Sequence, residues 1–153
     1  MKFYDYLEEN KDKIIDIYVD MDGVIAEYDI GNFDYSTIRP LKSNIEKIKN
    51  LLDNENINVY ILSVCKTNKI IEEKIDWFDK YMDFFDKENI VLISKEDEKY
   101  KNYESMELKN NYLLNNINKN NVNILVDDDN SIIKYISKNN DFIKLFQVSS
   151  WID

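Results

Sequence analysis

Two carboxylates that follow an apolar run, Asp20 and Asp22, are the residues of this chain best suited to chemistry. The run at residues 14–19 predicts a buried strand, and Gly23 lets the backbone turn away directly after the carboxylates. Carboxylates two residues apart at a strand end can face one pocket in different roles. One can bind a hard cation or attack phosphorus while the other moves a proton. An ordinary Asp-Gly turn is the alternative interpretation of this segment taken alone.

A second acidic segment, VNILVDDDNS, places aspartates where another apolar run ends. Asp127 is expected at the end of a strand, pointing into the crevice, with Asp128 just beyond it. Asp129 or Asn130 is expected to cap the following helix. Clustered carboxylates repel one another unless a cation lies among them. Together with Asp20 these residues predict a site for Mg²⁺, which prefers carboxylate, carbonyl and water oxygens.

Ser63 and Lys109 are candidates for binding a phosphoryl group. Ser63 is expected to end the strand in YILSVCK, where its hydroxyl could hold a phosphoryl oxygen, although helix caps and turns also use serine. Lys109 is expected to begin the helix before the second acidic segment, where its charge could balance a nucleophile and a phosphate. Lys95, Lys99 and Lys101 are rivals for this role, and a solvent-exposed lysine is the common alternative.

The composition excludes several classes of enzyme. The chain has no histidine, which excludes Ser-His-Asp and Cys-His catalysis, histidine-ligated zinc and a phosphohistidine intermediate. It has two glycines, too few for a Walker loop or a GxGxxG cradle. The formal net charge of −10 opposes general nucleic-acid binding. It also means that a phosphate substrate needs a local metal ion or lysine to offset the repulsion.

We expect one domain over residues 1–153, because a chain of this length can bury a single proper core. No stretch approaches a membrane span, and the segment MKFYDYLEENKDK carries charges where a signal peptide needs an apolar core. The single cysteine, Cys65, can form no disulfide within the chain, and we interpret it as a small buried residue near the site. The expected location is therefore the cytoplasm, with no membrane partner and with nucleic acid disfavoured.

Apolar strands alternate with amphipathic helices along the chain. This alternation predicts a three-layer, Rossmann-like α/β fold, in which a parallel sheet is covered by helices on both faces. Ligands of such sheets bind at the carboxyl ends of the strands, where the candidate residues lie. The expected strands are 14–19, 57–63, 89–94, 122–127 and 143–148, and the expected helices are 40–53, 68–85, 107–117 and 131–138.

The order of the polar segments resembles that of the haloacid dehalogenase (HAD) superfamily. DMDG comes first, followed by a strand-end serine, a lysine and a strand-end pair of aspartates, whereas response-regulator receivers use similar residues in another order. Within the superfamily, DMDGV, EKIDWFDKYM and LVDDDNSIIKYI are similar to segments of the 5′(3′)-deoxyribonucleotidase group. The four motifs of the superfamily would map to Asp20 and Asp22, Ser63, Lys109, and Asp127 with Asp128.

The resemblance implies a Mg²⁺-dependent phosphatase that acts through an aspartyl-phosphate. Asp20 would attack phosphorus, while Asp22 would protonate the leaving oxygen and then deprotonate the attacking water. Mg²⁺ would be held by the Asp20 carboxylate, the Asp22 backbone carbonyl and Asp127. Asp128 would reach the ion through water or orient its ligands. The residues that would bind the phosphoryl oxygens are Ser63 and Lys109.

Cap insertions set substrate choice in this superfamily, and here only residues 27–40 remain to form a minimal cap loop. We expect an open site that acts on a small phosphorylated metabolite, with (deoxy)nucleoside monophosphates, the substrates of a 5′-nucleotidase, among the candidates. A nucleic-acid end-processing phosphatase and a catalytically idle binding module are alternatives, and a homodimer could complete the pocket. Five loop aromatics could stack on a nucleobase or merely pack at the rim: Tyr28, Phe33, Tyr35, Tyr100 and Tyr103.

Overall fold

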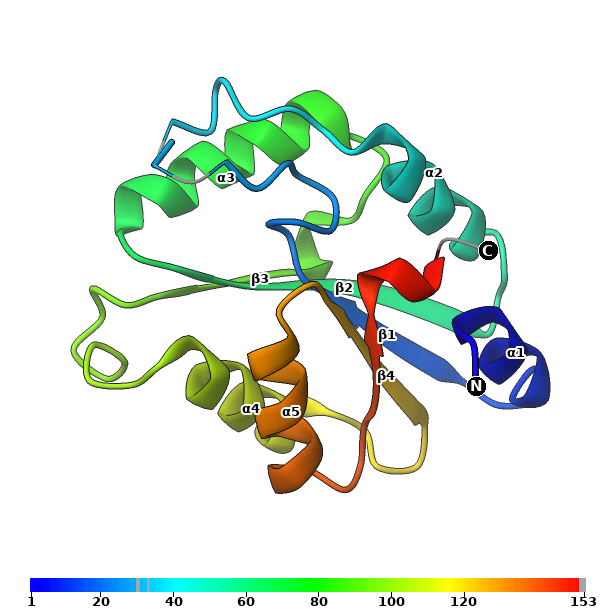
Figure 1. The fold of residues 1–153 in the computed structure, drawn as a ribbon. Coiled ribbons are helices and arrows are strands. Elements are labelled where there is room, and N and C mark those ends of the chain that lie inside the picture. The colour runs from blue at the N-terminus through cyan, green and yellow to red at the C-terminus, as the bar shows by residue number, and fades with distance from the viewer. Residues whose placement is uncertain (30, 33, 152–153) are drawn as a thin grey trace.

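The protein is built on a five-stranded sheet in which all paired strands are parallel (Figure 1). The computed structural model describes residues 1–29, 31–32 and 34–151. The strands are β1 (Ile15–Val19), β2 (Ile57–Cys65), β3 (Ile90–Ser94), β4 (Val122–Asp127) and β5 (Lys144–Gln147). Their order across the sheet is β3-β2-β1-β4-β5, so the first strand lies in the centre.

Helices cover both faces of this sheet, because parallel strands need crossover connections. The helices are α1 (Phe3–Glu9), α2 (Lys42–Leu51), α3 (Asn68–Tyr81), α4 (Ser105–Asn116) and α5 (Asn130–Asn139), with 3₁₀ turns η1 (Lys87–Asn89) and η2 (Val148–Trp151). In Figure 1, α2 and α3 lie on one face and α4 and α5 on the other. The result is the predicted three-layer α/β fold.

The central strand β1 shows how both faces are buried. Ile17 and Val19 belong to the apolar cluster that also holds buried residues of α2 and α3. The intervening residue, Tyr18, belongs to the cluster that holds buried residues of α4 and α5. Tyr18 also stacks on Tyr60 of β2, with the ring centroids 5.0 Å apart. Successive side chains of a strand point to opposite faces, so β1 contributes to both cores.

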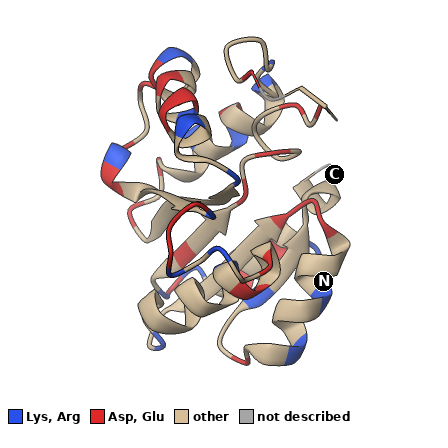
Figure 2. Cartoon of the chain, turned by 90° about the vertical axis from the view of Figure 1, so that its left-hand side faces the viewer, with Lys and Arg blue, Asp and Glu red and all other residues tan. Residues whose placement is uncertain are grey.

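Charged residues lie mainly on helices and loops, and the strands carry few of them (Figure 2). The two faces of a parallel sheet are both buried, which leaves little room for a charge within a strand. Within the described part of the chain, no helix is long and apolar enough to cross a membrane.

The second strand is longer than the sequence predicted, and this changes the position of Ser63. β2 continues to Cys65 because its last three residues pair with β3, with Cys65 opposite Ser94. Ser63 therefore lies within the strand and does not end it. Since apolar periodicity does not reveal how far a neighbouring strand extends, the sequence could not place this boundary.

Two helices also differ from their expected limits. α4 begins earlier than predicted, at Ser105, because Glu104 and Glu107 form a capping box there, so that Lys109 lies in the second turn. α3 ends at Tyr81, although buried apolar residues continue to Phe85 in the turn that follows. The apolar periodicity therefore predicted a helix that is too long, because these residues are buried without being helical.

The N-terminal helix α1 was not predicted, since its seven residues are too few for a clear helical period. Phe3 of this helix is fully buried and packs edge-on against Phe146 of β5, with the ring centroids 5.4 Å apart. Phe3 also contacts the Trp151 ring at 5.7 Å between centroids. Tertiary packing therefore holds α1 in place.

Candidate active site

The two acidic segments meet at the carboxyl edge of the central strands. β1 and β4 pair with Val19 opposite Val126, so that Asp20 and Asp127 follow at the same level of the sheet. The backbone N–H of Asp20 donates to the Val126 carbonyl oxygen at 3.0 Å. One carboxylate oxygen from each of Asp20, Asp127 and Asp128 lies within 4.8 Å of the others. This arrangement of oxygen ligands could hold a divalent cation.

Lys109 of α4 lies between two of these carboxylates. Its ammonium nitrogen Nζ is 2.8 Å from Asp20 Oδ1 and 2.7 Å from Asp127 Oδ2, and all three side chains are buried. Burial raises the pKa of Asp20 to about 7, although the Lys109 charge opposes the rise. Burial alone would lower the pKa of Lys109, but Asp20 and Asp127 outweigh it and raise that pKa. One ammonium among three carboxyl groups leaves the cluster short of positive charge, which favours a cation.

Gly23 makes room for the third carboxylate. Its backbone has a φ of +80°, which L-amino acids with side chains rarely adopt. A Cβ atom built on Gly23 would lie 2.0 Å from Asp128 Oδ2 and 2.5 Å from Asp128 Cγ. The glycine therefore serves both the turn after Asp22 and the approach of Asp128 to the cluster.

The third aspartate of the second acidic segment, Asp129, begins helix α5. Asp129 is the N-cap residue, and its Oδ1 accepts a hydrogen bond from the Ser131 backbone N–H at 2.8 Å. Of the two caps that the sequence allowed, Asp129 is the one formed, and Asn130 is the first residue of the helix. The Asp129 N–H donates to Asp127 Oδ1 at 3.0 Å, which fixes the Asp127 side chain.

Asp22 has a separate set of partners, which the sequence did not indicate. Its Oδ2 lies 3.1 Å from Nζ of Lys74, a buried lysine of α3, and its Oδ1 accepts a hydrogen bond from the Tyr35 hydroxyl. Lys74 Nζ also donates to Ser63 Oγ at 2.9 Å. Lys74 lies on the buried face of the amphipathic helix α3, together with Trp77 and Phe78. A lysine at helical spacing from such apolar residues was the signal in the sequence that could have drawn attention to it.

The remaining candidates from the sequence are Cys65 and the three lysines that were rivals of Lys109. Cys65 is buried, as predicted, and burial raises the pKa of its thiol. Among the rival lysines, Lys101 pairs with Glu98 at 3.0 Å and Lys99 lies 5.9 Å from the Tyr100 ring centroid. The backbone N–H of Lys95 donates to the Cys65 carbonyl oxygen at the end of β2.

The loop aromatics take different positions. Tyr28 is 66% exposed and lines the cavities beside Asp22. Tyr35 contacts Asp22, Tyr100 packs against the apolar cluster under α4 and α5, and Tyr103 is exposed. Phe33 lies outside the described residues.

Two adjoining cavities open at this edge of the sheet. The first, of about 370 Å³, is lined by the acidic cluster together with Asp22, Ser63 and Lys109. The second, of about 260 Å³, lies between the 27–40 segment and the start of α3 and also includes Lys74. Asp22 lines both cavities, so its carboxyl group lies where the two cavities adjoin.

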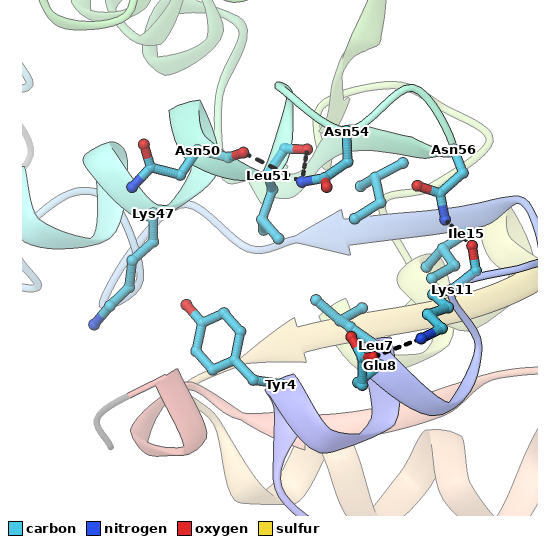
Figure 3. Close-up of a pocket in the computed structure, with 11 residues that line it drawn as sticks. Tyr4, Leu7, Glu8, Lys11, Ile15, Lys47, Asn50, Leu51, Asn54 and Asn56 are labelled. Atoms are coloured by element: carbon cyan, nitrogen blue, oxygen red, sulfur yellow. Dashed lines mark hydrogen bonds and ion pairs between the residues drawn. The ribbon is translucent and has the colours of Figure 1, made fainter.

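A third cavity, of about 420 Å³, lies at the amino ends of β1 and β2, on the opposite edge of the sheet. Figure 3 shows that residues of α1 and α2 and of the loops after them line it. Some of its polar groups are engaged locally: Lys11 pairs with Glu8 at 2.9 Å, and Asn54 donates to the backbone oxygens of Asn50 and Leu51. The acidic cluster does not line this cavity, so we take the carboxyl edge of the sheet as the candidate active site.

Comparisons with known proteins identify the fold. No protein-family model matches the chain, and no curated protein matches its sequence. Among solved structures, a chain of the Pnkp1/Rnl/Hen1 complex matches with a TM-score of 0.68 and 17% identity, over 88% of this chain and 46% of that one. The N-terminal part of protein BF1531 from Bacteroides fragilis, which contains a phosphatase domain complexed with Mg, matches with a TM-score of 0.58 and 15% identity, over 88% and 35%.

Both likenesses are structural and extend over most of this chain, which spans less than half the length of either matched chain. In this chain the acidic cluster lies at the carboxyl edge of the sheet, where parallel sheets bind ligands. The chain therefore has a three-layer α/β fold, which it shares with part of each matched chain.

Proposed function

We propose that the protein is a Mg²⁺-dependent phosphomonoester hydrolase that acts through an aspartyl-phosphate on Asp20. The observation that carries this proposal is the contact of one buried ammonium, Lys109, with both Asp20 and Asp127, beside an acidic cluster that opens onto a cavity. Phosphoryl transfer needs positive charge around a carboxylate nucleophile, and this arrangement supplies it. The structural likeness to the BF1531 fragment, which contains a phosphatase domain, supports the same class.

The proposed reaction has two steps. A carboxylate oxygen of Asp20 forms a bond to phosphorus while the bond to the leaving oxygen breaks, and Asp22 gives its proton to that oxygen. Asp22 then takes a proton from water as the water oxygen attacks phosphorus, which releases inorganic phosphate and restores the Asp20 carboxylate. Ser63 and Lys109 hold the phosphoryl oxygens, since both line the larger of the two cavities at this edge.

The residues present fit a magnesium ion. Asp20, Asp127 and Asp128 offer carboxylate oxygens within reach of one another, and the cluster carries more negative than positive charge. We assign the carboxylates of Asp20 and Asp127 and the backbone carbonyl of Asp22 as ligands, with Asp128 acting through water or by orienting them. Bound there, the ion would neutralise charge on the transferring phosphoryl group.

We propose small phosphorylated metabolites as substrates, with (deoxy)nucleoside monophosphates among them. The cavity between the 27–40 segment and α3 adjoins Asp22, where the leaving group must lie, and exposed Tyr28 offers a ring on which a base could stack. An end-processing phosphatase on nucleic acid is the second candidate, favoured by the open edge of the sheet but opposed by the net charge of −10.

The test is hydrolysis of p-nitrophenyl phosphate with Mg²⁺ and with chelator, followed by a panel of nucleotides, sugar phosphates and 5′- and 3′-phosphorylated oligonucleotides. We expect turnover only with Mg²⁺. We also expect Mg²⁺ to raise Tm in the wild type but not in Asp127→Ala, because a ligand bound only by the folded state stabilises it. Equal Mg²⁺ shifts in both proteins would contradict the ligand assignment, and no turnover by a folded, Mg²⁺-binding protein would favour an idle binding module.

A further inference from the structure

Lys74 is a buried lysine that the proposed reaction does not yet use. Its side chain is 1% exposed, and its Nζ contacts Asp22 Oδ2 at 3.1 Å and Ser63 Oγ at 2.9 Å. Removing an ammonium from water is unfavourable, and an ion pair inside a protein often contributes little net stability. An apolar side chain at this position would avoid that cost, so the contact with Asp22 calls for an explanation beyond stability.

Tyr35 holds the other oxygen of the same carboxylate. Its hydroxyl donates to Asp22 Oδ1, and its ring centroid lies 5.0 Å from Lys74 Nζ. Each oxygen of Asp22 therefore has one donor, and the two donors also contact each other. A carboxylate with a donor on each oxygen cannot rotate without losing one of these hydrogen bonds.

The Asp22 carboxyl group remains accessible despite these contacts. Its side chain is 28% exposed, and it lines both cavities at the carboxyl edge of the sheet. A carboxylate offers about four lone-pair positions, so two remain for a leaving group or water. The contacts with Lys74 and Tyr35 thus fix the direction of the group without closing it off.

Helix α3 fixes both donors. Lys74 lies in its middle, and the segment that carries Tyr35 is anchored to the same helix. The Trp77 indole N–H donates to the Ile38 carbonyl oxygen at 3.0 Å, a buried contact, and the Tyr35 backbone N–H donates to Glu73 Oε2 at 3.5 Å. A displacement of the 27–40 segment from α3 would therefore move Tyr35 away from Asp22.

We propose that Lys74 and Tyr35 are positioning residues that aim the Asp22 carboxyl group at the leaving oxygen of the substrate. This inference rests on the proposed phosphatase function. As Asp20 bonds to phosphorus and the bond to the leaving oxygen breaks, the Asp22 proton passes to that oxygen, and the two donors hold the carboxyl group where this transfer is short. Transfer depends steeply on geometry, since a misplacement of about 1 Å can cost about 10²-fold in rate.

The test measures kcat/KM over phosphate esters whose leaving groups differ in basicity, for the wild type, Lys74→Met and Tyr35→Phe. Alkoxide leaving groups need a proton, whereas 2,4-dinitrophenolate leaves without one. We expect kcat/KM for a nucleoside monophosphate or an alkyl phosphate to fall about 10–100-fold in each variant. For 2,4-dinitrophenyl phosphate we expect a loss of less than about threefold, so the dependence on leaving-group basicity becomes steeper.

Lys80→Met on the same helix and Tyr135→Phe on α5 are matched controls, and we expect both to match the wild type across the series. In an Asp22→Asn background, Tyr35→Phe should cost nothing further on alkyl phosphates, because the Tyr35 hydroxyl acts through Asp22. Tyr35→Phe removes one hydroxyl group, so it keeps the test valid if Lys74→Met does not fold.

Equal losses for all leaving groups would indicate a merely structural role and would overturn the proposal, as would unchanged rates in both variants. A loss in Tyr35→Phe that adds to that of Asp22→Asn would also overturn it. An inactive wild type would instead refute the phosphatase function itself, so the two failures are distinguishable.

Discussion

At the scale of single residues, the two carboxylates of the DMDG segment have different partners. Asp20 contacts Lys109 of α4, on one face of the sheet, whereas Asp22 contacts Lys74 of α3, on the other. Asp20 is buried and faces the acidic cluster, while Asp22 is partly exposed and borders the second cavity. This asymmetry suits one nucleophile and one group that moves a proton.

The Asp20→Asn variant should retain its fold and lose turnover by at least about 10³-fold, because an amide cannot form the acyl phosphate that the proposed reaction needs. Steady-state hydrolysis of p-nitrophenyl phosphate measures the loss. Acid-quenched wild-type protein should carry bound phosphate on this residue, and the variant should carry none. Turnover near that of the wild type would remove Asp20 as the nucleophile.

The same variant should reveal the electrostatic strain of the metal-free site. Burial raises the pKa of Asp20 from 3.8 to about 7, so the folded state holds this proton more tightly than the unfolded state. The contribution of Asp20 to stability is therefore full below about pH 4 and is lost as the pH rises through 7. We expect Asp20→Asn and the wild type to have similar Tm values with chelator at pH 4–5, and the variant to be more stable at pH 8.

A gain of about 1 kcal/mol would raise Tm by about 2–4 °C in a chain of this size. Thermal unfolding followed by circular dichroism at both pH values measures the difference. Mg²⁺ should reduce it, because the cation binds the ionised carboxylates of the wild type. A variant less stable than the wild type at pH 8 without metal would show that the contact between Asp20 and Lys109 outweighs the burial.

At the scale of elements, the turn after β1 decides whether the third carboxylate can join the cluster. Gly23→Ala places a methyl group where Asp128 now lies and imposes a φ that costs about 1–2 kcal/mol for a residue with a Cβ. We expect lower Tm, weaker stabilisation by Mg²⁺ and lower kcat. Gly31→Ala is the matched control, because it has a similar φ of +84° with nothing within 4 Å of the added Cβ. Equal effects of the two substitutions on Mg²⁺ binding would contradict the role given to Gly23.

The elements that carry the site were largely predictable because their signals are local. The apolar run before Asp20 and the run before Asp127 identify buried parallel strands, and a parallel sheet brings their carboxyl ends together. The inward position of Lys74 on α3 was a signal in the sequence, but it did not identify the partner, because the contact with Asp22 joins residues 52 positions apart and a lysine on a helix is usually exposed. Tyr35 was named only as a loop aromatic, since a segment without regular structure gives no periodicity from which to infer direction.

At the scale of the whole molecule, the net charge of −10 and the short 27–40 segment oppose tight binding of any anionic substrate outside the site itself. The phosphoryl group can be held by Lys109, Ser63 and a metal ion, but over its described residues the 27–40 segment forms only turns, bends and an isolated bridge. Such a segment buries little of a leaving group. We therefore expect most of the binding affinity to come from contacts with the phosphate group, which all of these substrates share.

This distribution of contacts predicts modest selectivity for the monomer. Each buried contact that separates two substrates contributes about 1–3 kcal/mol, and few are available here. We expect kcat/KM values for nucleoside monophosphates, sugar phosphates and p-nitrophenyl phosphate to fall within about 100-fold of one another, with nucleotides among the better substrates. A rate panel and the mass in solution from light scattering, taken at the same protein concentration, measure both quantities.

If the enzyme proves selective, its mass in solution shows whether a dimer or a monomer must account for the selectivity. A dimer formed over the site would supply the missing walls of the pocket, so selectivity should then fall on dilution to monomer. A monomer with sharp preference for a phosphate that is not a nucleotide would contradict the nucleotidase proposal. The Mg²⁺-dependent phosphatase chemistry would stand in that case, because it rests on Asp20, Lys109 and Asp127 rather than on the cavity that receives the leaving group.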